Sequence, residues 1–474
     1  MTMTATPSAS ETIAALTAHT WSPQPEPAKL VHRLLNECLQ RCAFAADLSQ
    51  RMLDQTGTRL LDWIDHFALP PSDPFRSQLG HVGYELEATG ANESVEHVWN
   101  HAGGMFPRVR EISGSSRQLA IKVSSVVDFL SAHRLFTIPI DGLPFSSLRR
   151  AKVSAENNVE FWVVERHGNN HFGLNEGIGT RNGHPVQNAD PLLLAQHGEA
   201  LRLRRRQFAT DAEGFEYAND LIDLAIADLG QDRACDLFFA AEREYWERRN
   251  HAGRVQFARQ ERLGLGWANH DHHTYRSSRD SFMSLIAFLE KLGFVCRERF
   301  YAGREAGWGA QVIEHPVTGV TIFADVDLSP EELAQDFSHE PLPPRNELGT
   351  VGLWCALHGE AFLQAGMHHL ECQFDFAATR DQLKQAGIET MPPFTDYPYL
   401  RQAFTRGETW PVDPSRVERL RAATRITDQQ AQQFLANGAL GSHLEILQRD
   451  DGYKGFNQKG INEIIAATDP RRAQ

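Results

Sequence analysis

The amino-acid sequence predicts an α+β fold in which a β-α-β-β unit recurs. Three segments, at 117–167, at 267–328 and from 366 onward, each combine strand-like alternation with one amphipathic helix. A block rich in Leu, Ala, Arg and Glu at 188–262 has helical spacing and separates the first unit from the second. Helical spacing also runs through 28–66. We therefore expect a fold built by duplication, with N-terminal helices and a helical insert.

The first two units show the pattern most clearly. In the first, RQLAIKV and the later SSLRRAKVS and NNVEFWVVERHG alternate like strands, and SSVVDFLSAHRL between them begins at a serine cap. In the second, WANHDHHTYR is strand-like, and the amphipathic helix SRDSFMSLIAFLEKLGF ends at Gly293. The run GAQVIEHPVTGVTIFADVDL then predicts a strand, a turn and a second strand.

The third unit begins with the strand-like GMHHLECQFDF and the helix AATRDQLKQAGI, where Gly387 occupies the place of Gly293. The stretch 395–420 reads as loops with a short helix. The end of the chain, SHLEILQRDDGYKGFNQKGIN at 442–462, has the pattern of a strand, a turn and the start of a helix.

These patterns divide the chain into five regions. Residues 1–27 form a loose N-terminal tail, 28–115 a helical region and 116–187 the first module. Residues 188–262 form the helical insert, and 263–474 contain the remaining modules with the metal site and a C-terminal gating helix.

Composition restricts the class of protein. The 474 residues carry a net charge of −14, which disfavours a nucleic-acid or anionic-membrane partner. Six cysteines in a chain of this length do not suggest a disulfide framework. The N-terminus has no basic region followed by an apolar core, and no run reaches the roughly 18 apolar residues of a membrane span. We expect a cytoplasmic protein.

Strand alternation places a carboxylate and histidines where a metal site can form. Glu445 lies on the strand face opposite to Leu444 and Ile446. His272 and His369 each stand on the strand that opens a unit, at equivalent places. Two histidines and one carboxylate on one face, with open positions left, are typical of non-haem iron sites. A second pair, His97 and His101, would share a face if 97–101 were helical.

The segment LEILQR followed by GYKGFN resembles the C-terminal signature of the 4-hydroxyphenylpyruvate dioxygenases, roughly FFEIIQR and then GFGxGNF. DHHT at 271–274 is similar to the family's DHxV motif, and GMHHLEC at 366–372 to its GVQHIAL motif. The resemblance implies the vicinal-oxygen-chelate fold, in which repeated βαβββ modules form curved mixed sheets. It also implies Fe(II) as cofactor, with His272, His369 and Glu445 as its ligands.

The chain departs from this family near its end. Phe456 matches one aromatic residue of the signature, whereas Asn457 replaces a glycine and Ile461 replaces a second phenylalanine. Residues 411–440 show no clear counterpart of the family's glutamine-bearing strand. The resemblance therefore implies the family's metal site in this chain, but it does not imply the family's aromatic substrate.

A second similarity is to the 2-oxoadipate dioxygenase/decarboxylases, or hydroxyglutarate synthases. HHTYR at 272–276 is similar to their first ligand motif, and it places Arg276 where a guanidinium can pair with a substrate carboxylate. Gln373 and Asn457 are further candidate polar contacts, and Phe456 would begin the gating helix over the site.

The resemblances imply an Fe(II)-dependent dioxygenase that oxidatively decarboxylates a 2-oxo acid and hydroxylates the same molecule. The expected partners are the 2-oxo acid and O2, and homo-oligomer formation is left open. Two alternatives keep the fold: an extradiol ring-cleaving dioxygenase, and a metal-dependent lyase or isomerase. A third alternative is a small-molecule binding protein without catalysis.

Overall fold

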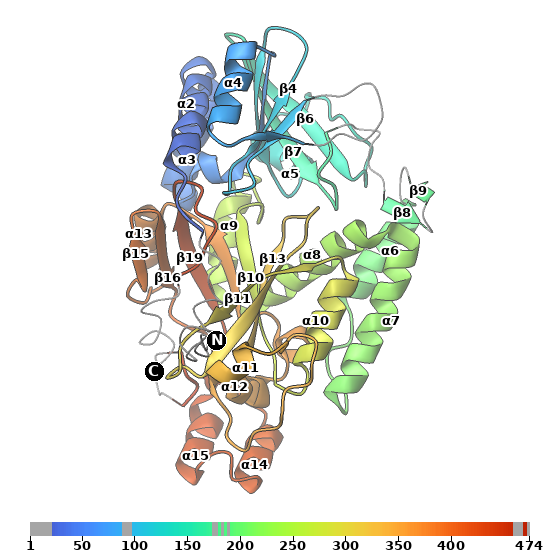
Figure 1. Ribbon diagram of the computed structural model, residues 1–474, viewed down its shortest axis with the longest axis vertical. Coiled ribbons are helices and arrows are strands. Elements are labelled where there is room, and N and C mark those ends of the chain that lie inside the picture. Colours follow the sequence, from blue (N-terminus) through green and yellow to red (C-terminus); the bar gives the residue numbers. More distant parts are fainter. Residues whose placement is uncertain are drawn as a thin grey trace, which may run out of the picture.

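Two β-sheets form the framework of the protein in the computed structural model, which describes residues 21–87, 97–172, 179–181, 184–186, 190–457 and 468–471. The first sheet lies at the top of Figure 1 and the second below it. The first sheet has the strand order β2-β3-β4-β1-β5-β7-β6, with strands β1 (Ile64–Leu69), β2 (Glu85–Leu86), β3 (Val98–Asn100), β4 (Arg108–Glu111), β5 (Arg117–Lys122), β6 (Leu148–Glu156) and β7 (Val159–Arg166).

The second sheet is larger and contains the predicted metal ligands. Its strand order is β11-β12-β13-β10-β14-β19-β16-β15, with strands β10 (His270–Arg276), β11 (Val295–Tyr301), β12 (Trp308–Glu314), β13 (Thr321–Asp327), β14 (His369–Gln373), β15 (Thr395–Tyr397), β16 (Leu400–Phe404) and β19 (His443–Arg449). Two further sheets have two short antiparallel strands each: β8 (Gly179–Arg181) with β9 (His184–Val186), and β17 (Thr409–Trp410) with β18 (Ala439–Leu440).

Both sheets have the same topology. In the first, β1 pairs with β4 and β5 with β7 in parallel, while β1 and β5 are antiparallel neighbours. In the second, β10 pairs with β13 and β14 with β19 in parallel, while β10 and β14 are antiparallel neighbours. Each parallel pair is joined through a helix, namely α4 (Asp73–His81), α5 (Val126–Ala132), α10 (Phe282–Lys291) or α13 (Phe376–Gln385). This confirms the predicted α+β fold of repeated modules in mixed sheets.

Local sequence explains where these helices begin and end. The Ser125 side chain accepts a hydrogen bond from the Asp128 amide at the start of α5, and Asp375 caps α13 in the same way. Gly293 follows α10 at φ +99°, a conformation that favours glycine.

Three expectations about secondary structure were wrong. The region 28–115 is helical only in its first half, as α2 (Pro25–Arg41) and α3 (Ala43–Thr56), because β1 to β4 follow and form a further module. The strands β2 to β4 have only two to four residues, too few to show a period. The stretch 395–420, expected to form loops with a short helix, also contains the strands β15 and β16. In the second unit, β11 lies between the helix α10 and the two strands expected to follow it. Residues 1–20 of the predicted tail lie outside the described residues.

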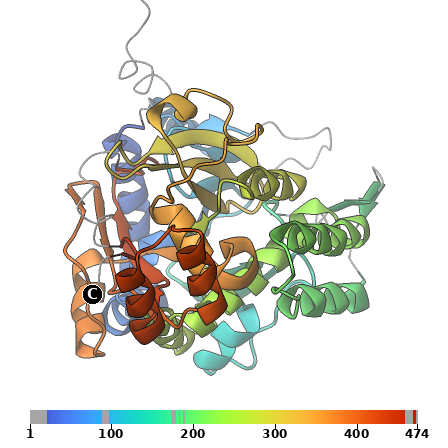
Figure 2. The same cartoon turned by 90° about the horizontal axis from the view of Figure 1, so that it is seen from below.

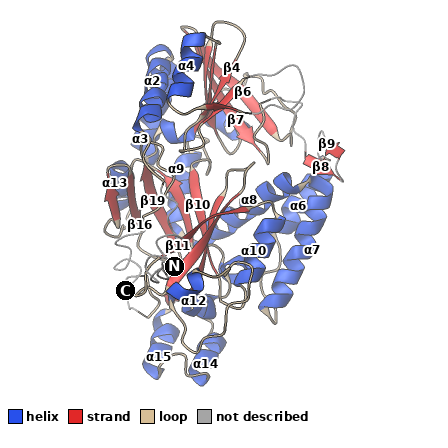
Figure 3. Ribbon diagram, in the orientation of Figure 1, coloured by secondary structure: helices blue, strands red, loops and turns tan. Residues whose placement is uncertain are grey.

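The predicted helical insert is present and covers the second sheet. It comprises α6 (Pro191–Arg202), α7 (Asp211–Leu229), α8 (Gln231–Arg249) and α9 (His251–Glu261), drawn as helices beside the sheet in Figure 3. Phe238 and Phe239 of α8 pack with Tyr275 of β10 and Phe282 of α10 in the largest apolar cluster. One face of the second sheet is thereby sealed, and the opposite face is left for the site.

The remaining helices complete the lower end of the molecule. They are α11 (Pro330–Leu333), α12 (Thr350–His358), α14 (Pro414–Ala422), α15 (Asp428–Asn437) and the short turn η2 (Ala361–Ala365). The short turn η1 (Leu60–Trp63) instead packs in the core of the first sheet. Figure 2 shows α14 and α15 side by side at this end. Leu353 and Leu357 of α12 pack with Val417 of α14 and Phe434 of α15 in a separate apolar cluster. In the described part of the chain, none of the helices has the length and apolar character that a membrane span requires.

One structural unit occurs in both sheets. Asp65 contacts the adjacent His66 at 2.6 Å (Oδ2 to Nδ1) and pairs with Arg166 at the end of β7. Asp271 contacts His272 at 2.8 Å and pairs with Arg449 at the end of β19. The strand registers match, because His66 lies opposite Ala120 and His272 opposite Glu371, each after a bulge. We call this arrangement the Asp–His–Arg unit.

Candidate metal centre

Three neighbouring strands bring two of the predicted ligands together with a glutamate. His272 of β10 lies opposite Glu371 of β14, and Glu371 lies opposite Glu445 of β19. One donor atom from each of the three lies within 4.8 Å of the others, and all three side chains are buried. His272 Nε2 is 3.4 Å from Glu371 Oε1. Imidazole and carboxylate donors at such spacing can hold a divalent transition metal ion.

The Asp–His–Arg unit of the second sheet fixes the orientation of His272. The histidine Nδ1 lies 2.8 Å from Asp271 Oδ2, so Nε2 faces the two glutamates. Asp271 also accepts hydrogen bonds from Arg449 Nε at 2.8 Å and from Gln373 Nε2 at 3.0 Å. Burial raises the pKa of Asp271, but Arg449 and His272 outweigh burial and hold this pKa well below its usual value. A carboxylate behind a ligating histidine is the usual support of a metal site.

The two glutamates form a buried acidic pair. Burial, with the neighbouring Glu445, raises the pKa of Glu371 well above its ordinary value. Burial likewise raises the pKa of Glu445 to about 8. Thr274 donates to Glu371 Oε1 at 2.7 Å, and Gln402 donates to Glu445 Oε1 at 2.7 Å, while Glu371 Oε2 has no partner among the described residues. Two adjacent buried carboxylates need a shared proton or a cation, so the donor set fits a divalent metal.

His369, the remaining predicted ligand, lines the same cavity but lies to one side of this group. Its Nδ1 is 3.3 Å from Glu371 Oε1, and its Nε2 has no partner among the described residues. The ring packs against Phe404 and against the neighbouring histidines His368 and His443. The ligand set His272, His369 and Glu445 stays a prediction, and Glu371 is a further donor between its members.

The cavity at this centre has aromatic walls and a volume of about 80 Å³. Its apolar lining consists of Phe300, Trp308, Phe323, Phe394, Phe404 and Phe456. The ring of Phe456 lies edge-on to His272 at 5.0 Å and to Phe323 at 4.4 Å between centroids. Such walls keep water away from the donor atoms and strengthen electrostatic interactions within the cavity.

Arg276 and Asp325 lie in the same cavity as strand neighbours. Arg276 is buried, and its Nε and Nη1 have no hydrogen-bond partner among the described residues. Burial lowers the pKa of Arg276 and raises that of Asp325 to about 8. At neutral pH the arginine is therefore the charged member of the pair, and its free N–H groups can bind a substrate carboxylate.

The other predicted contacts occupy different positions. Asn457 lines the cavity and donates to Thr395 Oγ1 at 2.8 Å. Gln373 does not line it, because its side chain supports Asp271 from the adjoining cleft. Ile461 and the predicted gating helix lie outside the described residues. His97 and His101 flank the strand β3 rather than sharing a helix face, and they contact Glu111 and Tyr84 respectively.

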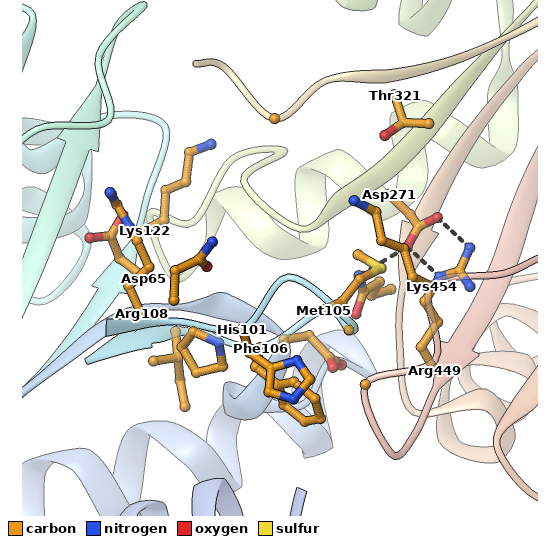
Figure 4. Close-up of a pocket in the computed structure, with 18 of the residues that line it drawn as sticks. Asp65, His101, Met105, Phe106, Arg108, Lys122, Asp271, Thr321, Arg449 and Lys454 are labelled. Carbon is orange, nitrogen blue, oxygen red and sulfur yellow. Dashed lines mark hydrogen bonds and ion pairs between the residues drawn. The ribbon is translucent and has the colours of Figure 1, made fainter. Parts of the chain in front are cut away.

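A larger cleft of about 630 Å³ lies between the two sheets and meets the cavity at Phe456, which lines both. Figure 4 shows Asp65 and Lys122 on the side of the first sheet, and Asp271 with Arg449 across from them. The guanidinium of Arg449 lies 4.9 Å from the centroid of the Phe456 ring. Phe456 thus lies between a large polar cleft and the smaller, mainly apolar metal cavity.

Three residues of this site were missed by the sequence reasoning. Glu371 lies on β14 two residues after His369 and was not proposed as a ligand, and Gln402 lies on β16, in a stretch expected to form loops. Asp325 stands in an apolar strand beside Arg276. A signal for the support of His272 was present, because the dipeptide Asp-His occurs at both 65–66 and 271–272.

Comparison with known proteins gives distant structural similarities. No family model matches the chain, and no curated protein matches it. Among solved structures, a protein from Ralstonia eutropha JMP134 described as a glyoxalase superfamily member is 14% identical, covers 56% of this chain and 99% of its own, and has a TM-score of 0.33. A mutant 4-hydroxymandelate synthase from Streptomyces coelicolor is 12% identical, covers 87% of this chain and 98% of its own, with a TM-score of 0.27. A methylmalonyl-CoA epimerase from Mycobacterium tuberculosis is 12% identical, covers 38% of this chain and 88% of its own, with a TM-score of 0.22.

Proposed function

We propose that the protein is an Fe(II)-dependent dioxygenase that oxidatively decarboxylates a 2-oxo acid and hydroxylates the same molecule. The observation that carries this proposal is an aromatic cavity that contains both a buried donor group and an arginine with two N–H groups that lack partners among the described residues. His272, Glu371 and Glu445 converge in this cavity, His369 lies beside them, and Arg276 offers two free N–H groups. A metal ion and an anionic substrate can therefore occupy one water-poor space.

The residues of the cavity have separate roles in this proposal. His272 and Glu445, with His369 or Glu371, hold the ion, and Asp271 keeps His272 in the tautomer whose Nε2 lone pair faces it. Fe(II) bound there would supply the Lewis acidity for chelating a 2-oxo acid and would activate O2, while the four electrons that O2 takes up would come from the substrate, two from its decarboxylation and two from its hydroxylation. Arg276 binds a substrate carboxylate and so fixes the substrate's direction in the cavity. Phe456 separates the reacting atoms from the open cleft.

Glu371, the additional carboxylate, specifically supports one of the alternative functions. An octahedral ion held by His272, Glu445 and one further ligand keeps three open positions, which suffice for a chelating substrate and O2. If His369 and Glu371 both bind, only two positions remain, enough for a chelating substrate alone. The second candidate is therefore a metal-dependent lyase or isomerase that enolises a carbonyl substrate without O2.

Oxygen uptake separates these possibilities. The protein, reconstituted anaerobically with Fe(II), is mixed with aromatic and aliphatic 2-oxo acids, including monoacids and diacids, while O2 and CO2 are measured. We expect one O2 consumed for each CO2 released with at least one substrate, and a large loss of activity in Arg276→Met. Turnover without O2 would overturn the dioxygenase and favour the second candidate. Tight substrate binding without turnover in the Fe(II) protein would instead indicate a binding protein.

A further inference from the structure

Beside the site described above lies a second cluster of metal-binding side chains. His368 and His369 of the β14 segment and His443 of β19 each offer a ring nitrogen, and these nitrogens lie within 4.8 Å of one another. All three side chains are buried, His368 and His443 completely. His369 lies opposite His443 in the parallel register of β14 and β19, so the two strands hold the cluster rigidly. We call it the three-histidine cluster.

Hydrogen bonds fix which nitrogen is free in two of the three rings. His368 Nδ1 donates to the Gly441 carbonyl at 2.8 Å, and His443 Nδ1 donates to the Thr405 carbonyl at 3.0 Å. A carbonyl oxygen can only accept, so both rings carry their proton on Nδ1. His369 Nδ1 faces the Glu371 carboxylate at 3.3 Å. The lone pair is consequently left on Nε2 in His368 and His443, and no Nε2 of the three rings has a hydrogen-bond partner among the described residues.

This is the arrangement that a metal site requires. A ligating histidine donates its other ring N–H to a backbone carbonyl or a carboxylate, which sets the tautomer and the ring orientation. His368 and His443 each make such a bond, and His369 Nδ1 lies 3.3 Å from the Glu371 carboxylate. Buried lone pairs without a donor are unfavourable in the absence of a cation, since each has lost its hydration without compensation.

From this geometry we infer that the three-histidine cluster is a second metal site, distinct from the His272, Glu371 and Glu445 group. Its donors are three neutral imidazoles without a carboxylate, a set that suits Zn²⁺ or Cu²⁺ better than hard cations. Arg276 lies on the neighbouring strand and opposes a cation there, whereas the Glu371 carboxylate, 3.3 Å from His369 Nδ1, favours one. His369 would then connect the two sites, with Nε2 on the second ion and Nδ1–H on a carboxylate of the first.

Metal stoichiometry tests the inference. Chelator-treated protein is dialysed to equilibrium against Zn²⁺, and bound zinc is counted per chain. We expect two ions in the wild type, one in His443→Gln and one in His368→Gln. Glu445→Gln should also keep one ion, because it impairs only the first site. The matched control is His358→Gln, since His358 is equally a buried histidine, with Nε2 bonded to the Leu440 carbonyl, but lies outside the cluster.

The outcomes distinguish this inference from the proposed function. A single ion in the wild type that is lost in Glu445→Gln but kept in His443→Gln would overturn the second site and leave the first intact. A single ion with the reverse dependence would support the cluster and remove the basis of the proposed function. Circular dichroism checks the fold of each variant. If His443→Gln fails to fold, Co²⁺ titration of the wild type still decides, since absence of a second spectroscopic equivalent would refute the inference.

Discussion

Replacing Asp271 by asparagine removes the charge that both orients His272 and neutralises Arg449. Arg449 makes a two-pronged pair with Asp271, at 2.8 Å and 3.1 Å, and both side chains are buried. An amide has only one acceptor oxygen, and its NH2 group would face either the arginine or the His272 N–H. Breaking a buried ion pair on one side costs about 3–5 kcal/mol of unfolding free energy. Losing the carboxylate behind a ligating histidine costs about 10–100-fold in metal affinity, or about 1.4–2.8 kcal/mol.

The pH dependence has a defined sign. Because the pKa of Asp271 is held below its value in the unfolded chain, its stabilisation is fully present at neutral pH. This stabilisation is lost as the pH falls below about 4 through the folded-state pKa. The stability difference between wild type and Asp271→Asn should therefore shrink in acid.

Urea unfolding of the metal-free proteins and calorimetric titration with Fe(II) or Zn²⁺ measure the two effects separately. Asp65→Asn is the matched control, because it breaks the same Asp–His–Arg unit in the first sheet, where Asp65 pairs with Arg166 and contacts His66. It should lose similar stability and keep its metal affinity. If Asp271→Asn bound metal as tightly as the wild type, or if Asp65→Asn weakened binding equally, the orienting role of Asp271 would be refuted.

Four further predictions concern the cavity. Arg276→Lys should raise KM for the carboxylate substrate at least tenfold in steady-state assays with little change in thermal midpoint, since a lysine cannot pair bidentately; unchanged KM would exclude Arg276 from substrate binding. Asp325 has a folded pKa of about 8, above its unfolded value, so it costs stability increasingly as pH rises from about 4 through 8, and above pH 8 its charge competes for Arg276. Asp325→Asn should abolish both this loss of stability and the rise in KM that accompanies it above pH 8. Urea unfolding measured from pH 5 to 9 checks the first effect, and KM measured over the same range checks the second. Gln402→Leu removes the bond to Glu445 and should weaken metal binding about tenfold by titration, whereas unchanged affinity would make Gln402 dispensable. Phe456→Ala should open the cavity to the cleft and raise O2 consumption that is uncoupled from product, and full coupling would show that Phe456 does not separate the cavity from the cleft.

The order of elements and part of the site followed from sequence periodicity. In β14 and at the start of β19 polar and apolar side chains alternate, because one face is sealed by helices and the other lines the cavity, so His369 and Glu445 were visible. Strand β10 reads HDHHTYR without such alternation, and His272 was found from its place on the strand that opens a unit. Gln402 was not, because β16 has five residues among loops and its role depends on pairing with β19. The position of His369 was also beyond the sequence. Alternation gives the face of a side chain but not the direction of its ring.

The N-terminal module shows the same limit. β1 reads IDHFAL and directly follows a helical segment, and its partner β4 has only four residues. Neither segment is long or regular enough to predict a strand from its sequence. The pairing of β1 with β5 makes the sheet, and such long-range contacts leave little trace in local composition.

The Asp–His–Arg unit occurs in both sheets, but in the described part of the chain the carboxylates that could bind a metal beside its histidine occur only in the second. In the first sheet, the register places Ala120 where the second has Glu371, and Trp162 where it has Glu445. His66 is therefore held by the same support as His272, but among the described residues it does not belong to a group of side chains spaced to hold an ion. The Asp–His–Arg unit is thus a feature of the paired modules in both sheets. The side chains at the positions of Glu371 and Glu445 determine whether its histidine can share a metal ion or only packs in the core. Replacing Ala120 and Trp162 by glutamates would place two carboxylates beside His66, and the first sheet would then carry the same three donor types as the second.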